Sequence, residues 1–135
     1  AFMIGIIVTV MVQSSSITTS ILVPLAAAGI LRLEQAFPIT IGANIGTTIT
    51  AMGAALAVSG PNAVAGIEIA LVHLFFNLSG AILIYPVRRI RQVPLQAARM
   101  LAAAAVRSKK LALLYVGTMF YGFPALLIYV TQLLK

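Results

Sequence analysis

The chain has 135 residues, of which 61% are hydrophobic and only 8% are charged, and its mean hydropathy is +1.10. Soluble domains carry about 25% charged residues, so this composition excludes an ordinary soluble domain and indicates a multi-pass protein of the cell membrane. The chain has no cysteine, which excludes disulfides and thiolate metal sites.

The net charge of +7 is concentrated, because seven of the nine Lys and Arg residues lie in residues 87–110. In a membrane protein such a basic run marks a cytoplasmic segment by the positive-inside rule, and no nucleic-acid partner is expected. The chain also begins within apolar sequence, which predicts a piece of a longer protein or a half that pairs with another half.

The first apolar stretch, residues 1–31, is divided near its centre by Gln-Ser-Ser-Ser at 13–16. At ~1.5 Å per residue, the arm before these residues reaches less than ~20 Å, against ~30 Å for the hydrocarbon core. We therefore expect a re-entrant helical hairpin that turns at 13–16 and returns to the cytoplasmic side at Arg32. The alternative is one ordinary span with a serine patch, although Pro24 and Gly29 weaken a long straight helix.

The second apolar stretch, residues 37–58, contains the sequence GANIGTTIT from Gly42 to Thr50. Because glycine permits unwound backbone, we expect a broken transmembrane helix here. Pairs of broken helices that meet near the bilayer midplane are typical of secondary transporters. The alternative is that Gly42-x-x-x-Gly46 is a helix-packing motif and that the threonines bond within or between helices.

Three further elements follow an external turn at 59–62. Residues 64–86 are long enough for a transmembrane helix, and the helix is expected to end just before Pro86. Residues 87–110 predict a basic helix along the cytoplasmic surface, and residues 111–134 predict the last transmembrane helix. This last helix is interrupted by two residues, Gly122 and Pro124.

The polar residues at the two interruptions suit the binding of small ions. A serine at the start of a half-helix caps it, and the N–H groups and partial positive charge of that helix end favour an anion. Serine and threonine hydroxyls and the Gln13 carbonyl are neutral oxygen ligands, which hard cations prefer. No Lys or Arg lies in the predicted spans beside these residues, so a bound anion would need a co-bound cation to offset its charge.

The segment QSSSITTSILVPLAAAGILRLEQAFPITIGANIGTTITA, followed by VHLFFNLSG and YPVRR, resembles the type II sodium-dependent phosphate cotransporter family. The resemblance is to the second, C-terminal, of that family's two inverted repeats, so it implies an all-α fold that is one half of a transporter. It also implies sodium-coupled transport of inorganic phosphate across the membrane, with sodium as the co-transported ion. That family has two QSSS repeats and this chain has one, so the other is expected from a missing N-terminal half or from a homodimer partner.

The resemblance assigns the site to the QSSS motif and to the threonine-rich segment. We expect two overlapping sets of ligands near the bilayer midplane. The sodium-binding residues would be Gln13, Ser14, Thr47 and Thr50. The phosphate-binding residues would be Ser14, Ser15, Ser16, Asn44 and Thr48.

His73 and Asn77 lie four residues apart on one helix face, where they could support the site from behind, although His73 bonded to a neighbouring carbonyl is the plainer interpretation. No catalytic residues are expected, because the chain has one His and two carboxylates and QSSS has no activating base beside it. The chain is therefore not expected to be an enzyme, to hold an organic cofactor or to bind a metal other than sodium.

Two alternative functions stay open at this point. The first is a carrier of another small anion, such as a dicarboxylate or sulfate, or a proton-coupled variant that uses His73 or Glu68. The second is a non-transporting membrane assembly subunit in which the serines and glycines only pack helices.

Overall fold

The computed structural model describes residues 1–133, and these residues form seven α-helices and one short π-helix, with no strand among them. They fall into two compact units, residues 1–95 and the residues from Gln96 onward. Three helical stretches are long and apolar enough to cross a bilayer: Leu33–Ala57, Ala63–Ile84 and Lys109–Leu133. The all-α fold that the resemblance implies is confirmed for the described residues, and the apolar helices are of membrane-spanning length, as the composition indicates.

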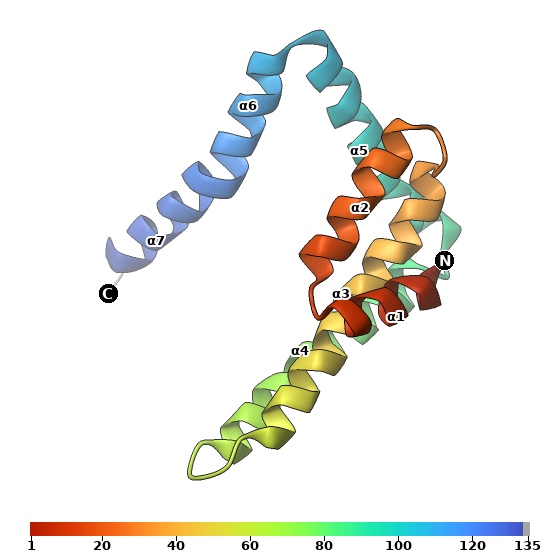
Figure 1. The fold of residues 1–135 in the computed structure, drawn as a ribbon. Coiled ribbons are helices and arrows are strands. Elements are labelled where there is room, and N and C mark those ends of the chain that lie inside the picture. The colour runs from red at the N-terminus through yellow and green to blue at the C-terminus, as the bar shows by residue number, and fades with distance from the viewer. Residues whose placement is uncertain (134–135) are drawn as a thin grey trace. The chain divides into compact units, whose positions relative to one another are not determined.

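Residues 1–31 form two short helices instead of one long span (Figure 1). α1 (Phe2–Val12) and α2 (Ser15–Ala27) have 11 and 13 residues, so at ~1.5 Å per residue neither reaches across a ~30 Å hydrocarbon core. The turn between them depends on Gln13, whose φ of 56° is left-handed and so ends α1. Ser14 is extended and its hydroxyl caps α2 by accepting the Ile17 N–H at 3.3 Å. The turn at QSSS is therefore formed by Gln13 and Ser14.

α3 (Leu33–Ala57) is one uninterrupted helix of 25 residues, so the predicted break at Gly42–Thr50 is wrong. The helix begins at Leu33, and the N-cap residue Arg32 donates its N–H to the side-chain oxygen of Gln35 at 3.0 Å. The threonine hydroxyls bond back to carbonyls of the preceding turn and leave the helical ladder intact.

The glycines of that segment serve close helix packing, which is the alternative that the sequence left open. A Cβ atom added at Gly42 would collide with the backbone oxygen of Phe2, and one added at Gly5 would collide with the backbone oxygen of Ile39. At Gly46 it would lie 2.8 Å from the Cβ of Thr9. α1 and α3 therefore meet backbone to backbone along a strip of glycine, as small residues allow between membrane helices.

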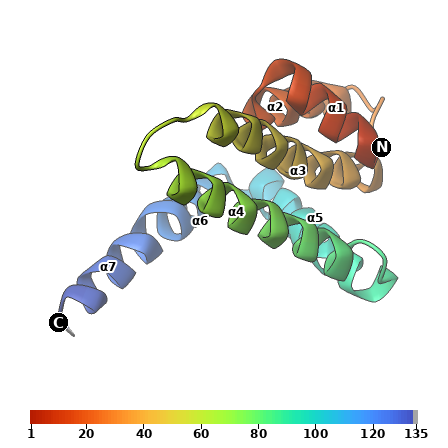
Figure 2. The ribbon, with the colours of Figure 1, turned by 90° about the horizontal axis from the view of Figure 1, so that it is seen from below.

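α4 (Ala63–Ile84) follows a turn at 58–62 that includes Gly60 with a φ of 97°. Figure 2 shows α4 beside α3, which it also contacts. Most of its apolar side chains are exposed in this chain by itself, for example Ile69 and Phe76.

α5 (Arg88–Arg107) is the basic helix predicted for residues 87–110. The second unit continues with α6 (Lys109–Gly117), which is capped by Ser108, the π-helix η1 (Thr118–Gly122) and α7 (Phe123–Leu133). The π-turn precedes Pro124, which has no N–H to donate, so the interruption predicted at Gly122 and Pro124 takes the form of a widened turn within one helical stretch.

Candidate functional site

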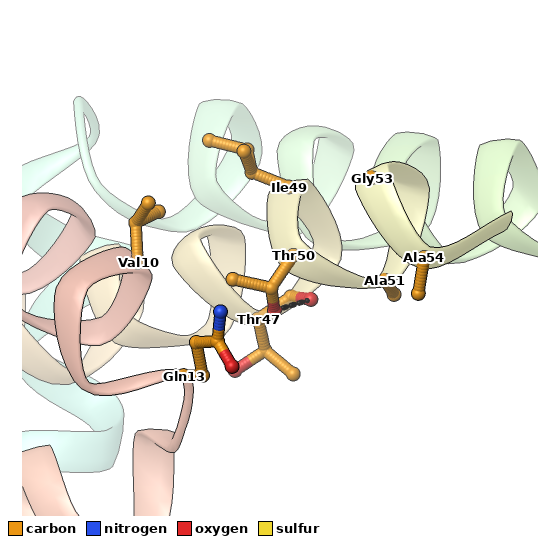
Figure 3. Close-up of a pocket in the computed structure, with 8 residues that line it drawn as sticks. All are labelled: Val10, Gln13, Thr47, Ile49, Thr50, Ala51, Gly53 and Ala54. Carbon is orange, nitrogen blue, oxygen red and sulfur yellow. Dashed lines mark hydrogen bonds between the residues drawn. The ribbon is translucent and has the colours of Figure 1, made fainter. Parts of the chain in front are cut away.

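An open groove of about 580 Å³ lies beside the turn between α1 and α2. It is lined by one residue of that turn together with α1 and the second half of α3: Val10, Gln13, Thr47, Ile49, Thr50, Ala51, Gly53 and Ala54. Figure 3 shows the Gln13 amide pointing toward Thr47 and Thr50. None of the lining residues is charged, so the groove offers only neutral polar groups on an apolar wall.

Gln13 reaches the groove because of two features of the backbone. The glycine strip holds α1 against α3, so the end of α1 lies beside the second half of α3. The left-handed conformation of Gln13 then ends the helix. Three of the four residues predicted to bind sodium, Gln13, Thr47 and Thr50, thus line one groove although they are distant in sequence.

The hydrogen bonds of the threonines decide what they can offer to a ligand. Thr47 Oγ1 donates to the Ala43 carbonyl at 3.0 Å, and Thr50 Oγ1 donates to the Thr47 carbonyl at 2.8 Å. A hydroxyl has one hydrogen to donate and two lone pairs. Since both hydrogens are used within α3, Thr47 and Thr50 present only lone pairs, which suit a cation and not an anion.

The serines, in contrast to the threonines, offer hydrogen-bond donors. The Ser14 hydroxyl accepts the Ile17 N–H, so its own hydrogen stays available to an acceptor. Ser15 and Ser16 form the first turn of α2, where N–H groups have no partner within the helix. Ser14 and Ser15 are half-buried and Ser16 is exposed. This end of α2 therefore presents donors, as an anion requires.

The structure separates the other predicted phosphate ligands from the groove. Thr48 is fully buried and its hydroxyl donates to the Ile45 carbonyl at 2.7 Å. Asn44 lines a different cavity of about 290 Å³ between α3 and α4, together with Asn77. Asn77 donates to the backbone oxygen of His73 at 3.1 Å, so these two residues do share a helix face.

One polar contact beside the site was not predicted. Thr9 Oγ1 donates to Thr18 Oγ1 at 2.9 Å, and both side chains are buried, with exposed fractions of 0% and 3%. The bond joins α1 to α2 about one helical turn from the Gln13–Ser14 turn on each side. A signal was present in the sequence, since Thr9 is the only polar side chain among residues 1–12.

The comparisons with known proteins show the family of the chain. Residues 1–128 match the model of a family described as Na+/Pi-cotransporter. Sodium-dependent phosphate transport protein 2B of Bos taurus and that of Homo sapiens are each 41% identical over 124 residues, which are 92% of this chain and 18% of the relative. Sodium-dependent phosphate transport protein 2A of Oryctolagus cuniculus is 40% identical over 126 residues, 93% of this chain and 20% of the relative.

The chain thus spans about a fifth of the length of the curated relatives that it matches. No solved structure matches it. The family match covers nearly all of the chain, and the chain therefore belongs to the Na+/Pi-cotransporter family, a family of transporters and not of enzymes.

Proposed function

We propose that this chain is one repeat of a secondary active transporter that moves inorganic phosphate across the membrane together with sodium. The observation that carries the proposal is the groove in which Gln13, Thr47 and Thr50 come together. Its lining has oxygen ligands and no fixed charge. Such a site suits a monovalent cation, because divalent cations in proteins are usually held by carboxylates.

In this proposal sodium is bound by the Gln13 carbonyl, the Thr47 and Thr50 hydroxyls and Ser14. Both threonines already use their hydrogens within α3, which favours a cation at their oxygens. Phosphate is bound by the donors at the start of α2, from Ser14 to Ser16. Asn44 and Thr48 lie away from the groove, so they have at most an indirect role in this arrangement.

The two ions support each other electrostatically. The basic residue nearest in sequence to the start of α2, Arg32, follows the far end of that helix, and the lining of the adjacent groove has no charged residue. A multivalent anion with only neutral partners in low dielectric is costly, and a sodium ion in the adjacent groove offsets that cost. This is a physical reason for obligatory coupling.

The other wall of the phosphate site would come from a second QSSS repeat, supplied by another part of the complete protein or by a second copy. Large apolar side chains on α4 are exposed in this chain, including Phe75 and Phe76. A bilayer or a partner repeat would cover them. We further propose that α1 and α2 enter and leave the membrane from the same side, which their short lengths favour. Arg32, which follows α2, makes this the cytoplasmic side by the positive-inside rule.

The sodium assignment is tested by Thr50→Val in the complete protein, with Thr40→Val as the matched control. Both are α3 threonines that donate to the carbonyl three residues back, at 2.8 Å and 2.7 Å, but only Thr50 lines the groove. Losing one ligand to a charged group corresponds to about tenfold or more, so sodium-dependent phosphate uptake should need about tenfold more sodium for half-saturation. Equal sodium half-saturation in the two variants would contradict the assignment.

The phosphate assignment is tested by Ser16→Ala, with Ser79→Ala as control. The Ser79 hydroxyl bonds within α4, to the Phe75 and Phe76 carbonyls. We expect Ser16→Ala to raise the phosphate concentration for half-maximal uptake several-fold, while sodium half-saturation at saturating phosphate stays unchanged. Uptake that is unaffected by Ser16→Ala and Thr50→Val alike would favour the assembly-subunit alternative. Competition by sulfate or a dicarboxylate as effective as by phosphate would favour another cargo.

A further inference from the structure

Another groove, also of about 290 Å³ but different from the cavity lined by Asn44 and Asn77, runs along the end of α4. It is almost entirely apolar. Its lining comes from α1, α4 and the residues just after α4: Phe2, Leu78, Ala81, Ile82, Tyr85 and Pro86. The exposed fractions of Leu78 and Ile82 are 39% and 61%. The groove therefore lies on the outer surface of a helix that is long enough to span a bilayer, at the end where the span stops.

Three arginines follow directly at the start of α5: Arg88, Arg89 and Arg91. The Arg91 guanidinium lies 5.3 Å from the centre of the Tyr85 ring, a cation–π distance. The Tyr85 ring is in turn 6.0 Å from the Phe2 ring. Tyr85 thus places the guanidinium of Arg91 at the edge of the apolar groove.

The sequence around this corner is strongly basic. The first turn of α5 contains no acidic residue, and the whole chain has two acidic residues against nine basic ones. Cations are also disfavoured at the start of a helix, where the dipole is positive. An anion bound by these arginines would remove both sources of repulsion.

We propose that this corner is a binding site for an anionic phospholipid, with its phosphate on Arg88, Arg89 and Arg91 and an acyl chain along the groove. An apolar groove that ends in arginines beside a tyrosine matches a lipid, whose apolar chain and charged headgroup meet at the membrane interface. Arginine is suited to the phosphate because its planar fork donates two parallel hydrogen bonds. A free phosphate ion would leave the apolar part of the site empty.

The test is lipid binding to the complete protein in detergent micelles, measured by native mass spectrometry with palmitoyl-oleoyl phosphatidylglycerol and phosphatidylcholine. We expect the anionic lipid to bind more tightly. Near a membrane surface each basic residue corresponds to about a fivefold gain in binding of an anionic lipid. Arg88→Gln/Arg89→Gln/Arg91→Gln should therefore lower phosphatidylglycerol affinity roughly a hundredfold.

The matched charge control is Arg107→Gln/Lys109→Gln/Lys110→Gln, which removes the same charge elsewhere in the basic segment. This control should leave phosphatidylglycerol affinity within about threefold of the parent, because the lost charges lie outside the proposed site. An equal loss in both triple variants would show general attraction to basic sequence and would overturn the site.

The groove is tested separately by Leu78→Ala/Ile82→Ala, with Ile69→Ala/Leu83→Ala as control. All four side chains are exposed on α4, but only the first pair lines the groove. We expect weaker phosphatidylglycerol binding for the first pair alone. Glycerol phosphate that competes as well as the intact lipid would overturn the acyl-chain assignment. If neither the arginine variant nor the groove variant changes phosphatidylglycerol affinity, something other than this lipid covers the surface, and the proposal is overturned.

Discussion

The close packing of α1 against α3 along the glycine strip can be tested by adding one methyl group there. We expect such a change to lower the stability of the protein and to weaken sodium binding. In Gly46→Ala, the new Cβ would lie 2.8 Å from Thr9 Cβ and 2.9 Å from the Ile6 backbone oxygen. Ordinary contacts between carbon atoms lie at about 3.5–4.0 Å. α1 must therefore move away from α3 by roughly 1 Å, because backbone atoms on a helix cannot yield separately.

The expected change in the free energy of unfolding for Gly46→Ala is the difference between two opposing effects. Overpacking of this kind costs typically about 1–3 kcal/mol, and replacing glycine by alanine within a helix regains roughly 0.5–1 kcal/mol. Gly46→Ala should thus destabilise the packing of α1 by about 0.5–2 kcal/mol. Gly66→Ala on α4 is the control, because nothing lies within 4 Å of its added Cβ, and it should be neutral or slightly stabilising.

Two measurements on the complete protein check this reasoning. Thermal unfolding in detergent, followed by circular dichroism, should show a midpoint a few degrees lower for Gly46→Ala than for Gly66→Ala. Sodium half-saturation of phosphate uptake should rise for Gly46→Ala alone, since displacement of α1 also moves Gln13 away from Thr47. If the two variants unfold at the same temperature and need the same sodium concentration, α1 does not pack on α3 through this strip.

Two further predictions concern the hairpin and the orientation of the chain. Thr9→Val and Thr18→Val should each destabilise by about 0.5–1.5 kcal/mol through loss of the buried hydroxyl contact. The double variant should cost less than the sum by roughly 0.6 kcal/mol, and strictly additive unfolding midpoints would argue against the bond. For orientation, the chain has no cysteine of its own, so Asn62→Cys in the exposed turn before α4 reports its side directly. An impermeant thiol reagent should label it on intact cells, and labelling only after permeabilisation would invert the proposed topology.

The helices were largely predictable, because they depend on apolar runs and local capping. The turn at QSSS could be placed from the sequence, since Gln and Ser interrupt an apolar stretch and Ser14 is a favourable N-cap. The start of α3 was predicted less accurately than the QSSS turn. Its start at Leu33 lies earlier than expected, because the Gln35 side chain reaches back to the Arg32 N–H and extends the helix through polar sequence.

The candidate site was predictable in its residue types but only partly in its membership. α3 contains four threonines, one in its first half and three near its middle: Thr40, Thr47, Thr48 and Thr50. Helical spacing places Thr47 and Thr50 on one face and Thr48 on another, but without the neighbouring helices no spacing rule says which face is open. The structure places Thr47 and Thr50 in the groove and buries Thr48 completely.

By itself, the sequence determined the membrane class, the helical stretches and the turn at QSSS, because these follow from apolar length, charge distribution and local hydrogen bonding. Only the tertiary structure decided how Gly42 and Gly46 are used. A glycine without a side chain permits an unwound backbone and a close helix contact equally well. The choice was made by α1, whose backbone lies where those side chains would be, and the same contact brings Gln13 to the threonines of α3.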